Sequence, residues 1–298
     1  MLQNRCLGAV YAAIILAIAA GAELDTAKIE EAAGAKGTLN HEEGVFKVTY
    51  PRKDVTVRVD GTVLPPFMGL TSWAAFKEGE KAQAMVMGDM VLFQDEVNPA
   101  MSAALENGLA VTALHNHFFY DEPKVYFMHI GGEGEAVALA AAVRKVQETV
   151  GEVRAASPKV ADSFGQKALT AESAISPGPL EELLGKGQVN DGMYKVVIGR
   201  TTKMPCGCEA GKEMGVNTWA AFYGTDSDAL VDGDFAVFEG ELQPVLSSLR
   251  KSGINIVAIH NHMESENPRV LFLHYWGRGV AAELAKGLRA ALDIIEKR

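Results

Sequence analysis

The sequence predicts an α+β protein built from two tandem homologous domains, each a mainly antiparallel sheet with helices on one face. Three observations support this prediction. A chain of 298 residues, 48% of them hydrophobic, is long enough to bury two cores. A long segment recurs at an offset of 145 residues, so that position 88 corresponds to position 233. Within each copy, strand-like and helix-like patterns follow one another in the same order.

Matched residues define the repeat on both sides of a one-residue gap. Gly88-Asp89 corresponds to Gly233-Asp234, and each dipeptide is followed by an apolar run. Upstream, Trp73-Ala74-Ala75-Phe76 corresponds to Trp219-Ala220-Ala221-Phe222, with the offset larger by one residue. We interpret both tryptophans as core residues on strands. The two copies are therefore expected to have the same fold.

The elements of copy one can be assigned in order. A short helix is expected at 27–33, strands at 46–50, 55–59, 71–76 and 84–93, a helix from Asn98-Pro99 to Gly108, strands at 109–117 and 125–129, and a helix at 135–150. Met87-Gly88-Asp89 is expected to form a bulge or bend. Copy two repeats this order from a short helix at 180–184 to a helix at 280–295.

These elements divide the chain into four segments. We assign residues 1–22 to a signal peptide, 23–151 to repeat domain 1, 152–179 to a linker rich in Ala, Ser, Gly and Pro, and 180–298 to repeat domain 2.

The first 22 residues have the pattern of a secretory signal. A basic segment ends at Arg5, an apolar run covers 7–19, and Ala20-Gly21-Ala22 supplies small residues at the cleavage site. An uncleaved anchor helix is the alternative, but the run is shorter than the roughly 20 residues that a membrane span needs. We expect an exported protein, periplasmic or extracellular, with no membrane span in the mature chain.

Charge and cysteines narrow the class of partner. The formal net charge is −10, and no basic stripe is present, so nucleic acid is not expected as a partner. Cys206 and Cys208 are the only cysteines after the signal segment. They suggest a soft-metal or redox role or, alternatively, an incidental pair in a loop, and copy one has no equivalent pair.

Histidines are the most informative residues for function. Six of the seven form two copies of one pattern: His115, His117 and His129 in copy one, and His260, His262 and His274 in copy two. Side chains two apart on a strand share a face, and a returning hairpin strand can bring the third histidine to that face. Three neutral imidazoles in this arrangement can bind a divalent transition metal, and zinc fits best.

Two pairs of acidic residues recur beside the histidines. Glu96 and Glu241 precede equivalent helices, and Asp121 and Glu266 lie four residues past the second histidine of each copy. Either pair can supply a fourth ligand, orient an imidazole or act as a general base. We favour Glu96 and Glu241, because the residue type is the same in both copies. Helix-end charges and solvated loop residues are the structural alternatives.

The chain resembles the LppY/LpqO family of exported proteins of undefined function. The resemblance rests on Thr71-Ser72-Trp73-Ala74-Ala75-Phe76, on Gly88-Asp89, on Ala113-Leu114-His115-Asn116-His117 and on the equivalent residues of copy two. It covers nearly the whole mature chain and implies a duplicated domain. This sequence has no lipid-attachment cysteine, so lipid anchoring is not implied.

Three functions remain open at this point. The first is an exported soluble protein that binds a zinc-like metal through one or both histidine clusters. The second is a metal-dependent hydrolase or oxygenase that uses Glu96 or Glu241 as base or fourth ligand. The third is a metal-free module that binds a small ligand through hydrogen bonds from the histidines.

Overall fold

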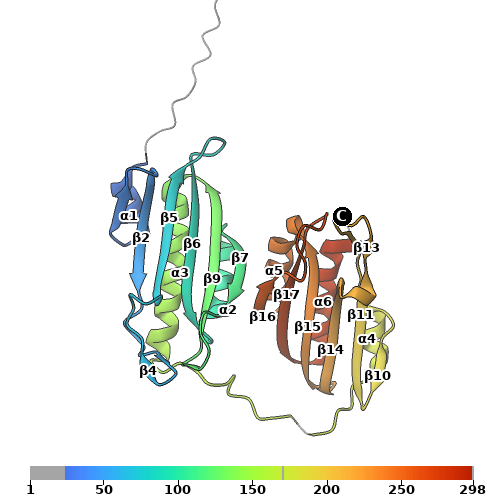
Figure 1. The fold of residues 1–298 in the computed structure, drawn as a ribbon. Helices are drawn as coiled ribbons and strands as arrows, with labels where there is room; N and C mark the ends of the chain where they lie inside the picture. Colours follow the sequence, from blue (N-terminus) through green and yellow to red (C-terminus); the bar gives the residue numbers. More distant parts are fainter. Residues whose placement is uncertain (1–23, 170, 297–298) are drawn as a thin grey trace, which may run out of the picture.

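A computed structural model describes residues 24–169 and 171–296, and it confirms the predicted fold class (Figure 1). The predicted signal peptide, residues 1–22, lies outside the described residues. Copy one contains α1 (Thr26–Ala33), β1 (Gly37–Asn40), β2 (Val45–Pro51), β3 (Arg58–Val59), β4 (Thr62–Val63), β5 (Thr71–Glu78), β6 (Ala84–Phe93), α2 (Val97–Glu106), β7 (Ala110–His115), β8 (Asp121–Glu122), β9 (Val125–Gly134) and α3 (Ala136–Ala156).

Copy two repeats this order with small additions. It contains α4 (Pro177–Leu184), β10 (Gln188–Asn190), β11 (Met193–Gly199), β12 (Thr202–Lys203), β13 (Glu209–Ala210), the 3-10 turn η1 (Lys212–Met214), β14 (Asn217–Thr225), β15 (Asp228–Phe238), the 3-10 turn η2 (Glu239–Glu241), α5 (Leu242–Lys251), β16 (Asn255–His260), β17 (Val270–Gly279) and α6 (Ala281–Glu296).

The two copies share one twelve-stranded sheet. Its order is β1-β2-β5-β6-β9-β7-β16-β17-β15-β14-β11-β10, so the second half repeats the first in reverse. The junction is an antiparallel pair of equivalent strands, β7 and β16, in which Leu114 lies opposite Ile259. A pseudo-twofold relationship follows, because each strand of the junction is the other's counterpart in the repeat.

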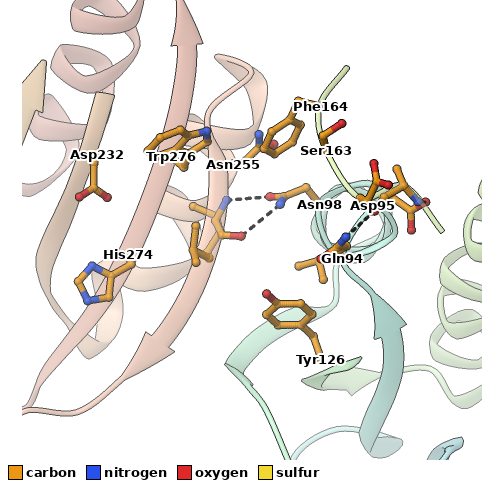
Figure 2. A pocket seen from close by; sticks show the side chains of 15 residues that line it. Gln94, Asp95, Asn98, Tyr126, Ser163, Phe164, Asp232, Asn255, His274 and Trp276 are labelled. Atoms are coloured by element: carbon orange, nitrogen blue, oxygen red, sulfur yellow. Dashed lines mark hydrogen bonds between the residues drawn. The ribbon is translucent and has the colours of Figure 1, made fainter. Parts of the chain in front are cut away.

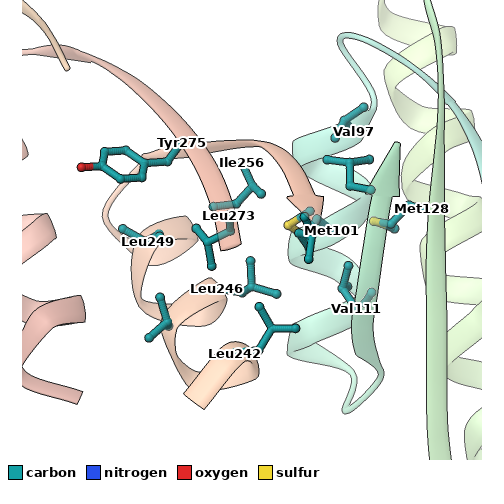
Figure 3. Close-up of a cluster of buried hydrophobic side chains, with 14 of the residues drawn as sticks. Val97, Met101, Val111, Met128, Leu242, Leu246, Leu249, Ile256, Leu273 and Tyr275 are labelled. Atoms are coloured by element: carbon teal, nitrogen blue, oxygen red, sulfur yellow. The ribbon is translucent and has the colours of Figure 1, made fainter. Parts of the chain in front are cut away.

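Helices cover one face of this sheet and bury a core that crosses the domain boundary. α2 of copy one packs against α5 of copy two, while α3 and α6 cover the flanking strands. Figure 3 shows Val97 and Met101 of copy one in the same group of buried side chains as Leu242, Leu246 and Leu249 of copy two. These residues belong to a single continuous cluster of buried side chains. The sequence did not predict this fusion of the two cores.

Among residues 24–169 and 171–296, the opposite face of the sheet carries two small apolar clusters. In copy one, Phe93 and Phe127 pack there under the segment that contains Val57 and Leu70. In copy two, Phe272 packs with Val216 and Ala210. The histidines lie on this same face, close to the two small clusters.

Several local predictions were wrong. β6 runs through Gly88-Asp89 in regular register, and the irregularity lies instead in β7, between Val111 and Ala113. Residues 55–59 contribute only the short strand β3, which pairs with β4 and β8 in a separate small sheet. α3 continues to Ala156, so the linker assigned to 152–179 begins with helix. Within the described ranges, no helix is long and apolar enough to cross a membrane.

Candidate metal centres

Strand alternation places the histidines away from the helices. In β9, Met128 and Ile130 belong to the main core, whereas Phe127 packs on the opposite face. His129 has the same parity as Phe127 and therefore shares its face. Asp89 lies directly opposite His129 in the pairing of β6 with β9. The corresponding pair in copy two is Asp234 opposite His274.

In copy two, three potential ligands converge, and His262 lies beside them. Ligand atoms of Asp234, His260 and His274 all lie within 4.8 Å of one another. His262 Nε2 lies 3.0 Å from His260 Nε2 and 3.8 Å from Asp234 Oδ2. Two ligands of a tetrahedral zinc ion, each about 2.0–2.1 Å from the metal, are about 3.3 Å apart. His260 and His262 are thus spaced as two ligands of a single ion would be, while the group whose ligand atoms all lie within 4.8 Å of one another consists of Asp234, His260 and His274.

In copy one, the same residue types converge less completely. His129 Nε2 lies 2.9 Å from His115 Nε2, and the rings of His115 and His117 are 5.1 Å apart between centroids. Asp89 is buried beside them, and its Oδ1 has no hydrogen-bond partner. Among the described residues, only copy two gathers three donor groups within mutual ligand distance.

A phenylalanine fixes the second histidine of each cluster. β7 ends at His115, so His117 lies beyond the strand and not on it as predicted. Its ring stacks on Phe127 with 3.3 Å between centroids and 6° between planes. His262 stacks on Phe272 with values of 3.5 Å and 10°. Stacking on the phenylalanine therefore holds the second histidine, a loop residue, beside the first, where a continuing strand was expected to place it.

The tautomer of His274 suits metal binding. Its Nδ1 lies 3.3 Å from the carbonyl oxygen of Gly233, so this nitrogen carries the proton if the contact is a hydrogen bond. Nε2 is then left with a free lone pair. A ligand imidazole is commonly oriented by such a bond from its other nitrogen.

Burial shifts the pKa values of residues in both centres. It raises the pKa of Asp234 to about 6 and also raises the pKa of Asp89, although nearby histidines oppose both shifts. Burial and neighbouring imidazoles lower the pKa of His117, His260 and His262. His117, His260 and His262 are therefore held mainly in the neutral form that ligates metal at pH 7. The carboxylates are buried without a protein cation to pair with, and a metal ion would neutralise them.

The donor set fits zinc on independent grounds. Oδ1 of Asp234 and Nδ1 of His260 are buried without a hydrogen-bond partner. Unpartnered buried polar atoms are costly and are found where a ligand or ion is bound. Three imidazoles and one carboxylate oxygen are donors that Zn²⁺ accepts in tetrahedral geometry.

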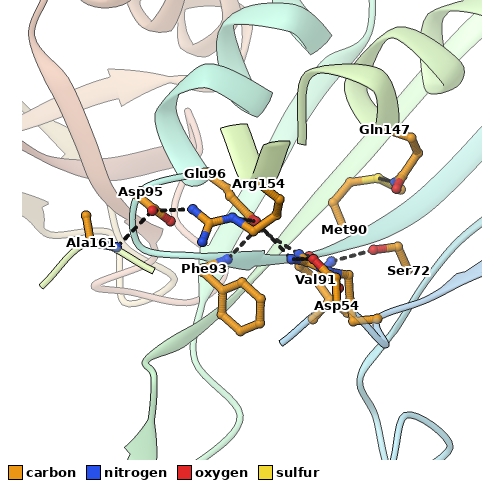
Figure 4. A network of polar contacts seen from close by, with 11 residues as sticks. Asp54, Ser72, Met90, Val91, Phe93, Asp95, Glu96, Gln147, Arg154 and Ala161 are labelled. Atoms are coloured by element: carbon orange, nitrogen blue, oxygen red, sulfur yellow. Dashed lines mark hydrogen bonds and ion pairs between the residues drawn. The ribbon is translucent and has the colours of Figure 1, made fainter. Parts of the chain in front are cut away.

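Glu96 and Glu241 do not belong to these centres. Glu96 is fully buried, and its carboxylate accepts hydrogen bonds from Arg52 at 2.7 and 2.8 Å (Figure 4). Arg154 Nε lies 2.7 Å from the same carboxylate. Glu241 is paired with Arg200 in the same way, and each glutamate also accepts a bond from a strand-end N–H, that of Phe93 or Phe238, at 2.8 Å. The proposed roles as base or fourth ligand are thus not supported by where these carboxylates lie.

Asp121 and Glu266 are structural as well. Asp121 accepts a hydrogen bond of 2.6 Å from the N–H of Val125, and Glu266 accepts one of 2.9 Å from that of Val270. Both bonds close the loop that leads into the return strand. Asn116 also ties this loop by donating to the carbonyl oxygen of Val125 at 3.1 Å.

Sequence reasoning missed Asp89 and Asp234. Both were visible as the acidic member of the repeated Gly-Asp pair, but they were interpreted as part of a bend. The usable signal was parity, because a charged residue alternating with core residues in a long strand faces the side opposite the core. Cys206 and Cys208, for their part, form a disulfide with each other in an exposed loop of copy two.

Fold and site together define a duplicated α+β protein that carries one histidine- and aspartate-lined centre in each copy. The chain belongs to the family described as Domain of Unknown Function (DUF1259), whose sequence pattern matches residues 27–149 and 179–294. No curated protein matches the chain. Among solved structures, a trimeric bacterial microcompartment shell protein, PduB, is similar at 10% identity over 87% of this chain and 90% of that one, with a TM-score of 0.21.

Proposed function

We propose that this protein binds a zinc-like divalent transition metal at each of two His₃Asp centres. The observation that carries the proposal is the convergence of Asp234, His260 and His274 within 4.8 Å on one face of the sheet, with His262 beside them. A metal-free ligand module would need partners for the buried polar atoms of Asp234 and His260, and the described residues supply none.

Metal binding is favoured over a metal-dependent hydrolase or oxygenase of the kind the sequence suggested. That alternative needed Glu96 or Glu241 as base, and arginines neutralise both carboxylates. A filled set of three histidines and one aspartate also leaves no ready position for water on a four-coordinate ion. Binding, sequestration or sensing of the metal is the simplest role for such a site.

We also propose that the protein is exported and processed after residue 22, and that it is related to the LppY/LpqO proteins. The basic segment, the apolar run and the small residues at 20–22 support export. A disulfide between Cys206 and Cys208 agrees with an oxidising compartment. Sequencing the N-terminus of protein recovered from the cell envelope or medium tests this, and a mature N-terminus at Met1 would exclude cleavage.

Metal stoichiometry tests the main proposal. We expect an untagged protein to retain two Zn²⁺ ions per chain after dialysis, and His260→Ala to lose one of them. His262→Ala should lower the occupancy of copy two and leave copy one loaded, because each centre is contained within its own copy. The control is His41→Ala, which removes the exposed seventh histidine. Unchanged metal content in His260→Ala, or an equal loss in the control, would contradict the proposal.

A further inference from the structure

A cavity of about 630 Å³ lies between the two copies, next to the copy-two centre. Its walls come from the turn between β6 and α2, the start of α2 and the start of β9 in copy one, from linker residues 161–164, and from β15, β16 and β17 of copy two (Figure 2). Its volume is within the range of sites that hold small organic molecules.

His274 belongs to both the metal centre and the cavity. It is one of the converging donors and also one of the residues that line the cavity. Trp276 follows two residues later on the same strand, so its indole shares that face and lines the cavity beside the histidine. A molecule in the cavity that contacts Trp276 is therefore close to the metal ligands.

The lining indicates what kind of molecule would fit. Aromatic surface comes from Trp276, Tyr126 and Phe164, and 71% of Phe164 is exposed. The charged groups among the described lining residues are all acidic: Asp95, Asp162 and Asp232. Asp95 is neutralised by Arg154, whereas Asp232 forms no ion pair with a cationic side chain among the described residues. A flat apolar molecule without negative charge suits this lining, and an anion would be repelled.

The linker wall is held in place at both ends. The N–H of Ala161 donates to Asp95 at 2.9 Å, and the side chain of Gln94 donates to the Ala161 carbonyl. At the other end, Arg278 donates to the carbonyl oxygen of Lys167 at 2.6 Å. The segment that carries Phe164 is thus tethered to copy one before it and to copy two after it.

Copy one lacks the equivalent lining. The residue at the position of Trp276 is Gly131, and the residue at the position of Asp232 is Met87. The linker occurs once in the chain and so can line only one such wall. The two centres therefore share their donor residues and differ in what surrounds them.

We propose that this cavity binds a small aromatic molecule that is neutral or cationic, and that its binding is coupled to metal binding at the copy-two centre through His274, which belongs to both sites. This inference rests on the proposed metal function, because it assigns an organic ligand to one of the two centres. Copy one would bind metal alone.

Three probes of one shape and different charge test the ligand class. Benzyl alcohol, benzylamine and benzoate are titrated into the Trp73→Phe/Trp219→Phe variant, in which Trp276 is the only tryptophan. We expect the alcohol and the amine to change the fluorescence of Trp276 in a saturable manner, and benzoate to bind at least tenfold more weakly. Equal affinity for benzoate would overturn the assignment of charge.

Two variants in the otherwise natural sequence locate the site and its link to the metal, with affinity measured by calorimetry. Trp276→Gly, which introduces the residue found at the equivalent position of copy one, should lower the affinity for benzyl alcohol at least tenfold. The control Trp219→Phe should leave this affinity unchanged. Zinc should strengthen benzyl alcohol binding severalfold, and His260→Ala should abolish that gain while His115→Ala preserves it.

The outcomes separate the two proposals. Two zinc ions per chain with no Trp276-dependent binding would overturn the inference and leave the metal function intact. Trp276-dependent binding that zinc does not affect, in a protein that holds two zinc ions, would overturn the assignment to the metal centre. A protein that binds no zinc would overturn the metal function itself, whatever the probes do.

Discussion

Asn98 and Gln243 occupy equivalent positions in the two copies, and each clamps the backbone of the other copy. Asn98 accepts from the N–H of Ile256 at 2.8 Å and donates to its carbonyl oxygen at 3.1 Å. Gln243 makes the same two bonds to Val111, at 2.9 and 2.8 Å. Val111 and Ile256 each begin the irregular step of their strand, where ladder pairing is interrupted. The clamps therefore satisfy backbone groups that the sheet leaves open.

Removing a clamp should destabilise the joined core. We expect Asn98→Ala to lower the free energy of unfolding by about 1–3 kcal/mol, because two buried backbone groups lose their partners. Gln243→Ala should have a similar effect. Denaturant unfolding measures both, with the exposed Asn190→Ala as control. If Asn98→Ala and Gln243→Ala are as stable as the control variant, the clamps contribute nothing to the free energy of unfolding.

Asp234→Asn should stabilise the metal-free protein while weakening zinc binding. Burial raises the pKa of Asp234 to about 6, so above that pH the folded protein holds at a cost, in a buried site, a charge that the unfolded chain exposes to water. This loss of folding stability grows as the pH rises from about 3.9, the pKa of aspartate in the unfolded chain, to 6. It then levels off at up to about 3 kcal/mol. Unfolding in EDTA should show the gain at pH 8 and little gain at pH 4. A loss of stability at pH 8 would contradict this reading.

Glu96→Gln should lower the stability of the protein without changing its zinc binding. The substitution removes the buried carboxylate that Arg52 and Arg154 share and leaves them only Asp54 and Asp95, so the cost is at most the roughly 3–5 kcal/mol of an uncompensated buried charge. Zinc stoichiometry should remain at two, since Glu96 lies outside both centres. The exposed Glu42→Gln is the matched control. A folded Glu96→Gln protein that loses one zinc would restore the role of this residue as a ligand.

Phe272→Leu should weaken zinc at copy two without removing it. The ring of Phe272 stacks on His262, and such pairs contribute about 0.5–1.5 kcal/mol, or roughly two- to tenfold in affinity. Competition with a chromophoric chelator measures the affinity of each centre. Phe127→Leu should produce the same loss at copy one only, and a change at both centres from either variant would argue against independent sites.

The fold was predictable because its signals are local. The offset between Gly88-Asp89 and Gly233-Asp234 revealed the duplication, and strand alternation with helix-end residues located most elements. The junction of β7 with β16 was not predictable, because strand pairing between copies depends on tertiary packing. The continuous core around Met101 and Leu246 was not predictable for the same reason.

The site was predictable in its histidines and not in its carboxylate. Imidazoles at repeated spacing stand out in a sequence, whereas one aspartate among many acidic residues does not. Retention of Glu96 and Glu241 in both copies did not distinguish a ligand from a buried ion pair, and the structure places Glu96 in an ion pair with Arg52. Only the register of β6 against β9 shows that Asp89 lies opposite His129.

X-ray absorption at the zinc edge tests the central claim most directly. In untagged protein loaded with two zinc ions, we predict a first shell of nitrogen and oxygen at about 2.0–2.1 Å, with three imidazoles per ion and no sulfur. Asp234→Asn should alter the oxygen contribution of one ion in two. A sulfur shell at about 2.3 Å, or fewer than two imidazoles per ion, would contradict the assignment of both centres.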